Sequence, residues 1–199
     1  GLEFDVVFHA VDTTRNQTIY EDRSLTVETI PLDHRIACCG FLFREKPTLP
    51  HIRRDMIDCY DIPLSQINNI KNGADWVTVD GETIPNSRLT TPASPPRAYA
   101  YCSDTRYMPS LAEKVRGVDV LYHEATYDSS CAARARLYYH STAAQAAQVA
   151  RDAAVGKLIL GHFSARYDQE ECLLQEAQAV FPNSLLAHEG LVVQVGQGK

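Results

Sequence analysis

Short apolar runs alternate with helical patterns through the second half of this chain, and the alternation constrains the fold more than any other feature. Each apolar run is followed by polar residues, which is typical of strands that end in functional loops. The predicted strands are Arg97–Ser103, Val118–Tyr122, Lys157–Leu160 and a closing pair, Leu185–Ala187 with Leu191–Val195. The predicted helices between them are Pro109–Arg116, Ala143–Ala154 and Gln169–Val180. The resulting β-α-β-α-β-α-β order predicts an α/β fold.

The helix predicted over Ala143–Ala154 is the clearest of these elements. Its alanines recur on one face, while Gln145, Gln148 and Asp152 lie on the opposite face. Either Ser141 or Thr142 can cap its N-terminus. Because alanine side chains are small, we expect this helix to lie close against a sheet.

The first half of the chain predicts three further strands and an insertion. The strands are Phe4–Val11, Ser24–Leu32 and Ile36–Phe43, with the polar segment Asp12–Asp22 as a hairpin connection. The proline-rich segment Pro47–Arg97 predicts an insertion or connector with little core of its own, containing short helices at Arg53–Cys59 and Leu64–Ile70. Its basic residues, the best candidates for a local patch, are Arg53, Arg54, Lys71 and Arg88.

Composition narrows the class of protein. The chain of 199 residues is 45% apolar and 22% charged, which fits one soluble domain, residues 1–199, or part of a larger one. No apolar run approaches the roughly 18–20 residues of a membrane span. Six scattered cysteines without a C-x-x-C pair indicate reduced thiols, so we expect a cytoplasmic protein. The net charge of −6 argues against general electrostatic attachment to nucleic acid or membrane, but leaves a local basic patch open.

Polar residues that follow the predicted strands form the candidate site. They are Asp33-His34, Asp104, His123-Glu124, His140 and His162. Two imidazoles and a carboxylate from separate strand ends suit Zn²⁺, because imidazole nitrogen and carboxylate oxygen are ordinary zinc ligands. Spacing alone leaves an alternative open, since imidazoles at strand ends can simply be satisfied structural groups.

The exact strings around these residues resemble a known family. In chain order they are Pro31-Leu32-Asp33-His34, Tyr101-Cys102-Ser103-Asp104-Thr105, His123-Glu124-Ala125-Thr126, His140-Ser141-Thr142 and His162-Phe163-Ser164-Ala165-Arg166-Tyr167. Together they are similar to the C-terminal two-thirds of ribonuclease Z, the tRNA 3′-processing endoribonucleases of the metallo-β-lactamase superfamily. The resemblance implies an αββα sandwich, of which this chain is the C-terminal part, and a two-zinc site at one edge.

The resemblance also implies roles for individual residues. His34, Asp104 and His162 match metal ligands, with Asp104 at the position of the carboxylate that bridges the two metals. Glu124 and His140 match residues implicated in proton transfer, and Arg166 matches a residue that contacts a substrate phosphate. The implied reaction is hydrolysis of precursor tRNA that removes the 3′ trailer and leaves a 3′-hydroxyl. Family relatives are commonly homodimers.

Two departures from the family pattern change what we expect of this chain. The signature H-x-H-x-D-H is absent, so we expect that the chain lacks an N-terminal portion, that its metal site is weak or empty, and that it lacks full nuclease activity. Where bacterial relatives have a Gly-Pro-rich stretch in the arm that clamps tRNA, this chain has Asp61–Gln66 without a Gly-Pro pair. The form of the arm is therefore open.

Two other functions fit the same residues. One is a different phosphodiesterase or hydrolase of the superfamily, because a fold does not decide its substrate. The other is a non-catalytic binding or dimerisation module.

Overall fold

Residues 3–196 are described by the computed structural model, which divides the chain into two units. Unit 1 comprises residues 1–45 and 97–199, and unit 2 comprises residues 46–96. None of the described helices is long and apolar enough to cross a membrane.

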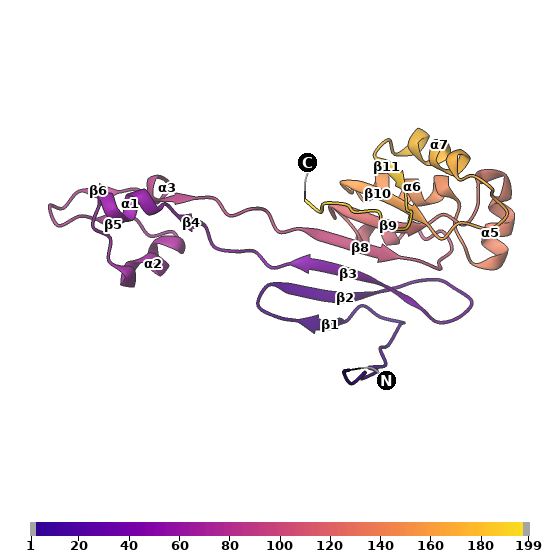
Figure 1. Cartoon of the computed structure of the whole chain (residues 1–199), viewed down its shortest axis with the longest axis horizontal. Coiled ribbons are helices and arrows are strands. Elements are labelled where there is room, and N and C mark those ends of the chain that lie inside the picture. Colours follow the sequence, from indigo (N-terminus) through magenta and orange to yellow (C-terminus); the bar gives the residue numbers. More distant parts are fainter. Residues whose placement is uncertain (1–2, 197–199) are drawn as a thin grey trace. The chain divides into compact units, whose positions relative to one another are not determined.

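Unit 1 is built on one seven-stranded sheet with the order β1-β2-β3-β8-β9-β10-β11 (Figure 1). The strands are β1 (Thr18–Glu21), β2 (Leu25–Pro31), β3 (Cys39–Glu45), β8 (Ala98–Cys102), β9 (Val120–Glu124), β10 (Lys157–Gly161) and β11 (Ser184–Leu186). Strands β1, β2, β3 and β8 pair antiparallel, whereas β8, β9, β10 and β11 are parallel neighbours. Helices α4 (Leu111–Lys114), α6 (Ala143–Asp152) and α7 (Glu171–Val180) connect the parallel strands, which confirms the predicted alternation.

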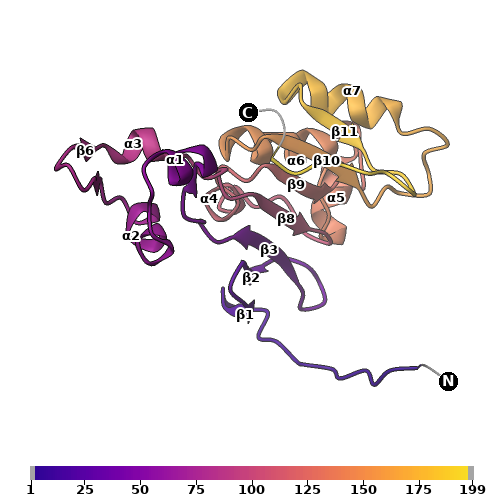
Figure 2. The same cartoon turned by 60° about the vertical axis from the view of Figure 1, so that its left-hand side comes forward.

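One face of the parallel strands is covered by helices, which gather beside β8–β11 in Figures 1 and 2. Ala100, Leu121 and Leu158 of this face are fully buried in the same hydrophobic core as the alanines of α6. Small side chains on α6 let its backbone approach the sheet closely, which gains dispersion contacts over a long strip. Thr142, rather than Ser141, caps α6, because its hydroxyl accepts from the Gln145 N–H while the Gln145 side chain accepts from the Thr142 N–H.

The opposite face of the sheet carries a row of aromatic side chains. Phe41, Tyr101 and Tyr122 are in register across β3, β8 and β9, and the Tyr101 and Tyr122 rings stack with their centroids 4.6 Å apart. Residues 191–195, predicted as a strand, form none. Leu191, Val193 and Val195 of this segment line a cavity of about 350 Å³ together with Tyr99 and Tyr122. The closing pair therefore reduces to β11 alone.

The N-terminal strand prediction is wrong. The segment Phe4–Val11 is irregular, and Phe8 is 92% exposed, because none of the described strands pairs with it. Strand β1 instead forms inside Asp12–Asp22, the segment predicted as a connection. The Asp22 carboxylate accepts from the N–H groups of Ser24 and Leu25, which closes the turn and aligns β1 against β2.

Unit 2 has a hydrophobic core of its own, although its proline content predicted little core. Its elements are β4 (His51–Ile52), α1 (Arg54–Cys59), a 3₁₀ turn (Leu64–Gln66), α2 (Ile67–Lys71), β5 (Trp76–Val77), β6 (Thr83–Ile84), α3 (Asn86–Leu89) and β7 (Thr90–Thr91), most of which are labelled in Figure 1. Ile62, Ile70, Ile84 and Leu89 are buried together, and Trp76 packs against them. Two of the predicted patch residues are engaged inside the unit. Arg53 pairs with Asp55, and Arg88 lies over the Tyr60 ring.

Glu45 and Arg97 join the two ends of unit 1 between which unit 2 is inserted. The Glu45 N–H donates to the Arg97 carbonyl (2.9 Å), and the Arg97 N–H and guanidinium donate to the Glu45 carboxylate. These side-chain and backbone hydrogen bonds lower the pKa of Glu45 to about 2. Because the folded pKa lies below the value of about 4.3 for an unfolded Glu, the pair stabilises the fold at neutral pH.

We predict that Glu45→Gln lowers the free energy of unfolding at neutral pH. The variant should also lose part of the decrease in this free energy that the wild type shows as the pH falls. The native advantage is fully present above about pH 4.3 and is lost as the pH falls towards about 2. The measurement is urea unfolding of wild type and variant at a series of pH values in this window. A difference between the two proteins that stays constant across the window would contradict the assignment.

Candidate metal centre

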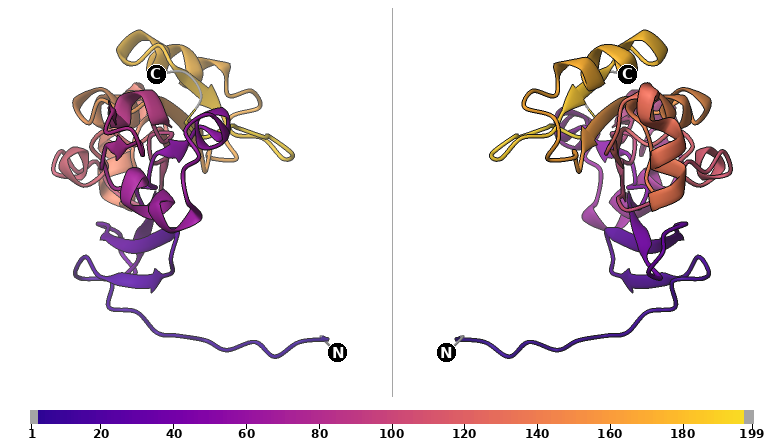
Figure 3. Two further views of the ribbon diagram at one scale, coloured as in Figure 1. Left: turned by 90° about the vertical axis from the view of Figure 1, so that its left-hand side faces the viewer. Right: turned by 90° about the vertical axis from the view of Figure 1, so that its right-hand side faces the viewer.

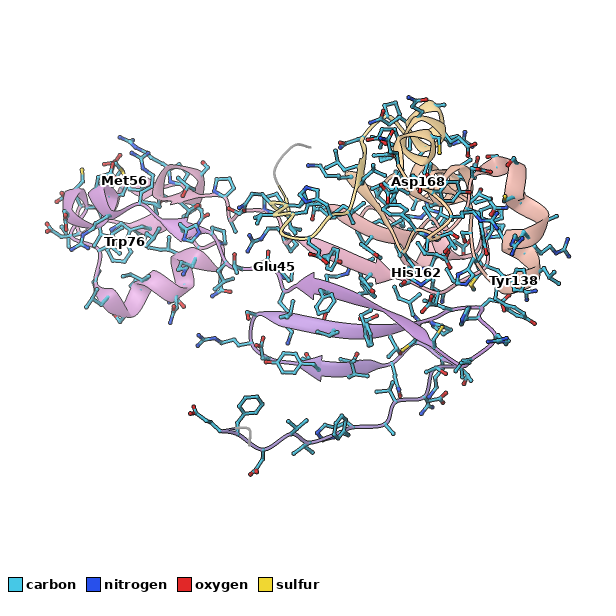
Figure 4. All side chains as sticks on the ribbon, turned by 45° about the vertical axis from the view of Figure 1, so that its right-hand side comes forward. Glu45, Met56, Trp76, Tyr138, His162 and Asp168 are labelled. Atoms are coloured by element: carbon cyan, nitrogen blue, oxygen red, sulfur yellow. The ribbon has the colours of Figure 1, made fainter. Side chains whose placement is uncertain are left out.

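The candidate site lies where the parallel strands end. Asp104 follows β8, Glu124 is the last residue of β9, and His162 follows β10. His140 lies between α5 (Ala132–Tyr138) and α6, and His34 follows β2. Figure 4 labels His162 beside the end of β10 and Tyr138 on α5. Parallel strands bring these residues together because their carboxyl ends share one edge of the sheet.

Asp104 and His162 face each other directly. The His162 Nε2 atom lies 3.0 Å from Asp104 Oδ1, and both side chains are less than half exposed. Both residues have left-handed backbones, with φ of 58° for Asp104 and 57° for His162. This conformation costs a non-glycine residue roughly 1–2 kcal/mol, and such strain is often held at functional sites.

Glu124 is the buried acceptor that organises the loops of the site. Its side chain is 0% exposed and receives four hydrogen bonds. The donors are the Thr105 N–H (2.7 Å), the Thr126 hydroxyl (2.6 Å), the Ser141 N–H (3.1 Å) and His140 Nδ1 (2.9 Å). A buried carboxylate without such donors would carry a large desolvation cost. Glu124 therefore ties the loop after β8, the end of β9 and the loop before α6 to one point.

The contact between Glu124 and His140 changes the acid-base properties of both groups. The hydrogen bond to Glu124 raises the pKa of His140 above its ordinary value, and desolvation opposes the shift only in part. Burial would raise the pKa of Glu124, but the hydrogen bonds from His140 and Thr126 bring it below the usual range. The pair therefore favours a charged carboxylate next to an imidazole that holds a proton readily.

In each of the three histidines of the site, the Nδ1 atom of the ring has a hydrogen-bond partner within the protein. Nδ1 lies 3.0 Å from the Tyr139 carbonyl oxygen in His34, and 2.9 Å from Glu124 in His140. In His162, Nδ1 lies 3.0 Å from the Thr126 hydroxyl, which donates its single proton to Glu124 and so accepts from the ring. The second nitrogen, Nε2, then carries the lone pair in each neutral ring. Histidines that bind metals are oriented by a hydrogen bond at the other nitrogen in this manner.

The predicted site residues do not all converge. The ligand atoms of Asp104, Glu124, His140 and His162 lie within 4.8 Å of one another, a set that can hold a metal ion. His34 is outside this set, although its ring centroid is 5.2 Å from that of His140. Arg166 is exposed and lies against Cys131 Sγ (3.4 Å) and over the Tyr127 ring.

Several supporting residues were not predicted individually. Thr105 and Thr126 position Glu124, and Ser141 donates through its hydroxyl to the Thr105 carbonyl oxygen (2.8 Å). All three are buried polar residues within the matched strings, which was the available signal. Asp33, which precedes His34, accepts from the Arg106 guanidinium (2.6 Å).

Known proteins resemble this chain over nearly all of its length. No family model matches the sequence. Ribonuclease Z of Bacteroides fragilis (strain YCH46) is 56% identical over 194 residues, which cover 98% of this chain and 64% of that protein. Ribonuclease Z of Porphyromonas gingivalis (strain W83) is 44% identical over the same share of each chain. Over nearly its whole length, this chain is homologous to ribonuclease Z. It spans slightly less than two-thirds of the length of these relatives.

Solved structures show the fold of this ribonuclease Z homologue. A metallo-β-lactamase fold protein from Bacillus subtilis matches with a TM-score of 0.56 and 16% identity, over 94% of this chain and 55% of that one. The short form of human tRNase Z matches with a TM-score of 0.53 and 18% identity, over 92% of this chain and 48% of that one. The metallo-β-lactamase fold predicted from the sequence is therefore confirmed.

We predict that Glu124→Gln destabilises the fold by about 1–3 kcal/mol, because the new amide NH₂ group would face donors instead of accepting from them. The measurement is chemical denaturation followed by circular dichroism. The control is Glu189→Gln at an exposed side chain, which should leave the stability within about 0.5 kcal/mol of wild type. Equal stability of the two variants would show that Glu124 does not organise the site.

Proposed function

We propose that this chain carries part of the active site of a zinc-dependent endoribonuclease that removes the 3′ trailer from precursor tRNA and leaves a 3′-hydroxyl. The observation that carries the proposal is the placement of Asp104, His140 and His162 around one point, in a chain homologous to ribonuclease Z. The substrate class rests on the relatives, because their name states a ribonuclease and the fold alone would not specify RNA.

The donor set fits a zinc site. Asp104 offers a carboxylate oxygen, and His162 offers Nε2 because Thr126 occupies its Nδ1. His34 offers Nε2 in the same way, since Tyr139 occupies its Nδ1. We assign Asp104, His162 and His34 as metal ligands of a site that is completed by further ligands. Bound zinc would acidify a water molecule and stabilise the negative charge that develops on phosphorus.

The neighbouring pair of Glu124 and His140 suits proton transfer. In the proposed reaction, water attacks phosphorus, the bond from phosphorus to the 3′ oxygen breaks, and that oxygen needs a proton. His140 supplies the proton from Nε2, and the hydrogen bond from its Nδ1 to Glu124 fixes the ring and stabilises its charged form. Arg166, which is exposed in the loop between β10 and α7, would contact a substrate phosphate.

The remaining features of the proposal follow the relatives. A homodimer and a cytoplasmic location are what we expect of a protein that processes precursor tRNA. This chain by itself should have weak metal affinity and no full nuclease activity, because Asp104, His162 and His34 are fewer ligands than a two-zinc site needs.

The test compares the product of the complete gene with this chain. We predict that the complete product cleaves precursor tRNA at the trailer, and that His162→Ala reduces the rate by more than about 100-fold while weakening zinc binding. His188→Ala is the matched control, since His188 is exposed and outside the ligand set, and it should leave the rate within about twofold of wild type.

Three results would contradict the proposal in different ways. Cleavage of bis-p-nitrophenyl phosphate without cleavage of precursor tRNA would indicate another phosphodiesterase of the same fold. Binding of tRNA without any cleavage would indicate a non-catalytic module. Robust cleavage by the 199-residue chain alone would show that the proposed ligand set is already sufficient.

A further inference from the structure

A cavity of about 390 Å³ lies beside His140, on the side of the loop that follows β8. Its lining residues come from three stretches of unit 1, residue 33, residues 106–107 and residues 136–145, and are Asp33, Arg106, Tyr107, Arg136, His140 and Gln145. Because His140 is one wall, a group held in the cavity would be adjacent to the group on which His140 acts. The volume is at the small end of the range for ligand pockets and is sufficient for about one nucleotide.

Two of the charged lining residues neutralise each other. Arg106 donates to the Asp33 carboxylate through Nη2 (2.6 Å) and Nε (3.0 Å), and its guanidinium lies 4.2 Å from the centroid of the Tyr139 ring. These contacts hold the Arg106 side chain in place and balance the charge of Asp33. The negative charge of Asp33 therefore does not repel an anion that enters the cavity.

Arg136 leaves the cavity with an unbalanced positive charge. It is an exposed residue of α5, and its guanidinium forms no hydrogen bond or ion pair with any residue that the structure describes. Gln145 adds a neutral donor, because its Oε1 accepts from the Thr142 N–H and only its NH₂ group remains to donate. A free guanidinium and amide donors next to a catalytic imidazole suit a phosphate group.

A second cavity lies on the other side of His140 and has a different chemistry. It measures about 450 Å³ and is lined by His34, His140, the rings of Tyr127, Tyr138 and Tyr139, Leu137 and the exposed Arg35. Aromatic walls suit bases better than phosphates. Both cavities contain an exposed arginine, but the Arg136 cavity has one aromatic ring, Tyr107, and adds the Gln145 amide donor, so it is the better suited of the two to the RNA backbone.

We propose that the Arg136 cavity binds a backbone phosphate of the RNA next to the bond that is cleaved, with Arg136 as its positioning residue. This inference rests on the proposed endoribonuclease function and adds a subsite to it. Arg136 acts by fixing the strand relative to His140, because a bound neighbouring phosphate restricts where the reacting phosphate can lie.

The experiment measures binding, so that it does not depend on a complete metal site. A fluorescently labelled single-stranded RNA of about 12 nucleotides is titrated with the 199-residue chain at several salt concentrations, and anisotropy gives the affinity. We expect Arg136→Gln to weaken binding about 5- to 10-fold and to reduce the slope of log affinity against log salt by about 0.7–1. Arg136→Lys should retain most of the slope, since it keeps the charge.

Arg134→Gln is the matched control on the same helix. Arg134 is also exposed, but its guanidinium lies over the Tyr138 ring, and it does not line the Arg136 cavity. Its removal lowers the net charge by the same amount, and we expect binding within about twofold of wild type. Circular dichroism melts of all variants exclude unfolding as the cause of any loss.

Each outcome separates this inference from the function on which it rests. Equal losses in Arg136→Gln and Arg134→Gln would indicate general attraction and would overturn the subsite. Normal RNA binding by Arg136→Gln would also overturn it and leave the proposed function standing. Failure of the wild-type chain to bind RNA would overturn the subsite, whereas failure of the complete product to cleave precursor tRNA would separately overturn the proposed function.

Discussion

The buried carboxylate of Glu124 is the interaction on which the site depends. A fully buried charge is tolerated only when it is surrounded by donors, and here two backbone N–H groups, one hydroxyl and one imidazole supply them. Since these donors come from separate loops, satisfying one charge fixes the positions of three chain segments. The same group sets the protonation of His140 and, through Thr126, the orientation of His162. Packing and chemistry are therefore coupled through a single side chain.

The hydrogen bonds to Glu124 also support the left-handed backbones of Asp104 and His162. Each residue leaves its strand through a sharp change of direction, and the two side chains meet across the end of β9. Such conformations persist only when the surrounding structure compensates for them. The compensation is visible in Thr105 and Thr126, the neighbours of these loops, which both bond to Glu124. Figure 3 shows the ribbon from two opposite sides.

Much of unit 1 could be predicted from the sequence because its signals are local. Short stretches of sequence are enough to recognise the alternating apolar runs, the alanine face of α6 and the polar strings after each strand. Phe4–Val11 looks like a strand by the same criteria, but a strand also needs a partner, and the sequence does not say whether one exists. The core of unit 2 was missed because Ile62, Ile70, Ile84 and Leu89 are far apart in the sequence and show no periodicity. The position of Arg106 against Asp33 was missed for the same reason, since 73 residues separate them.

The insertion of unit 2 has a consequence for how such a chain can change over evolution. Strands β3 and β8 are antiparallel neighbours, and Glu45 and Arg97 close their shared end through backbone and side-chain hydrogen bonds. Topologically, the two strands are a hairpin in which the turn has been replaced by a folded unit with its own core. The sheet needs only that the two ends of the replacement meet at this hydrogen-bonded position. A unit attached in this way can lengthen, shorten or acquire a new surface while the strands that carry the site keep their register, so recognition and chemistry can diversify at different rates.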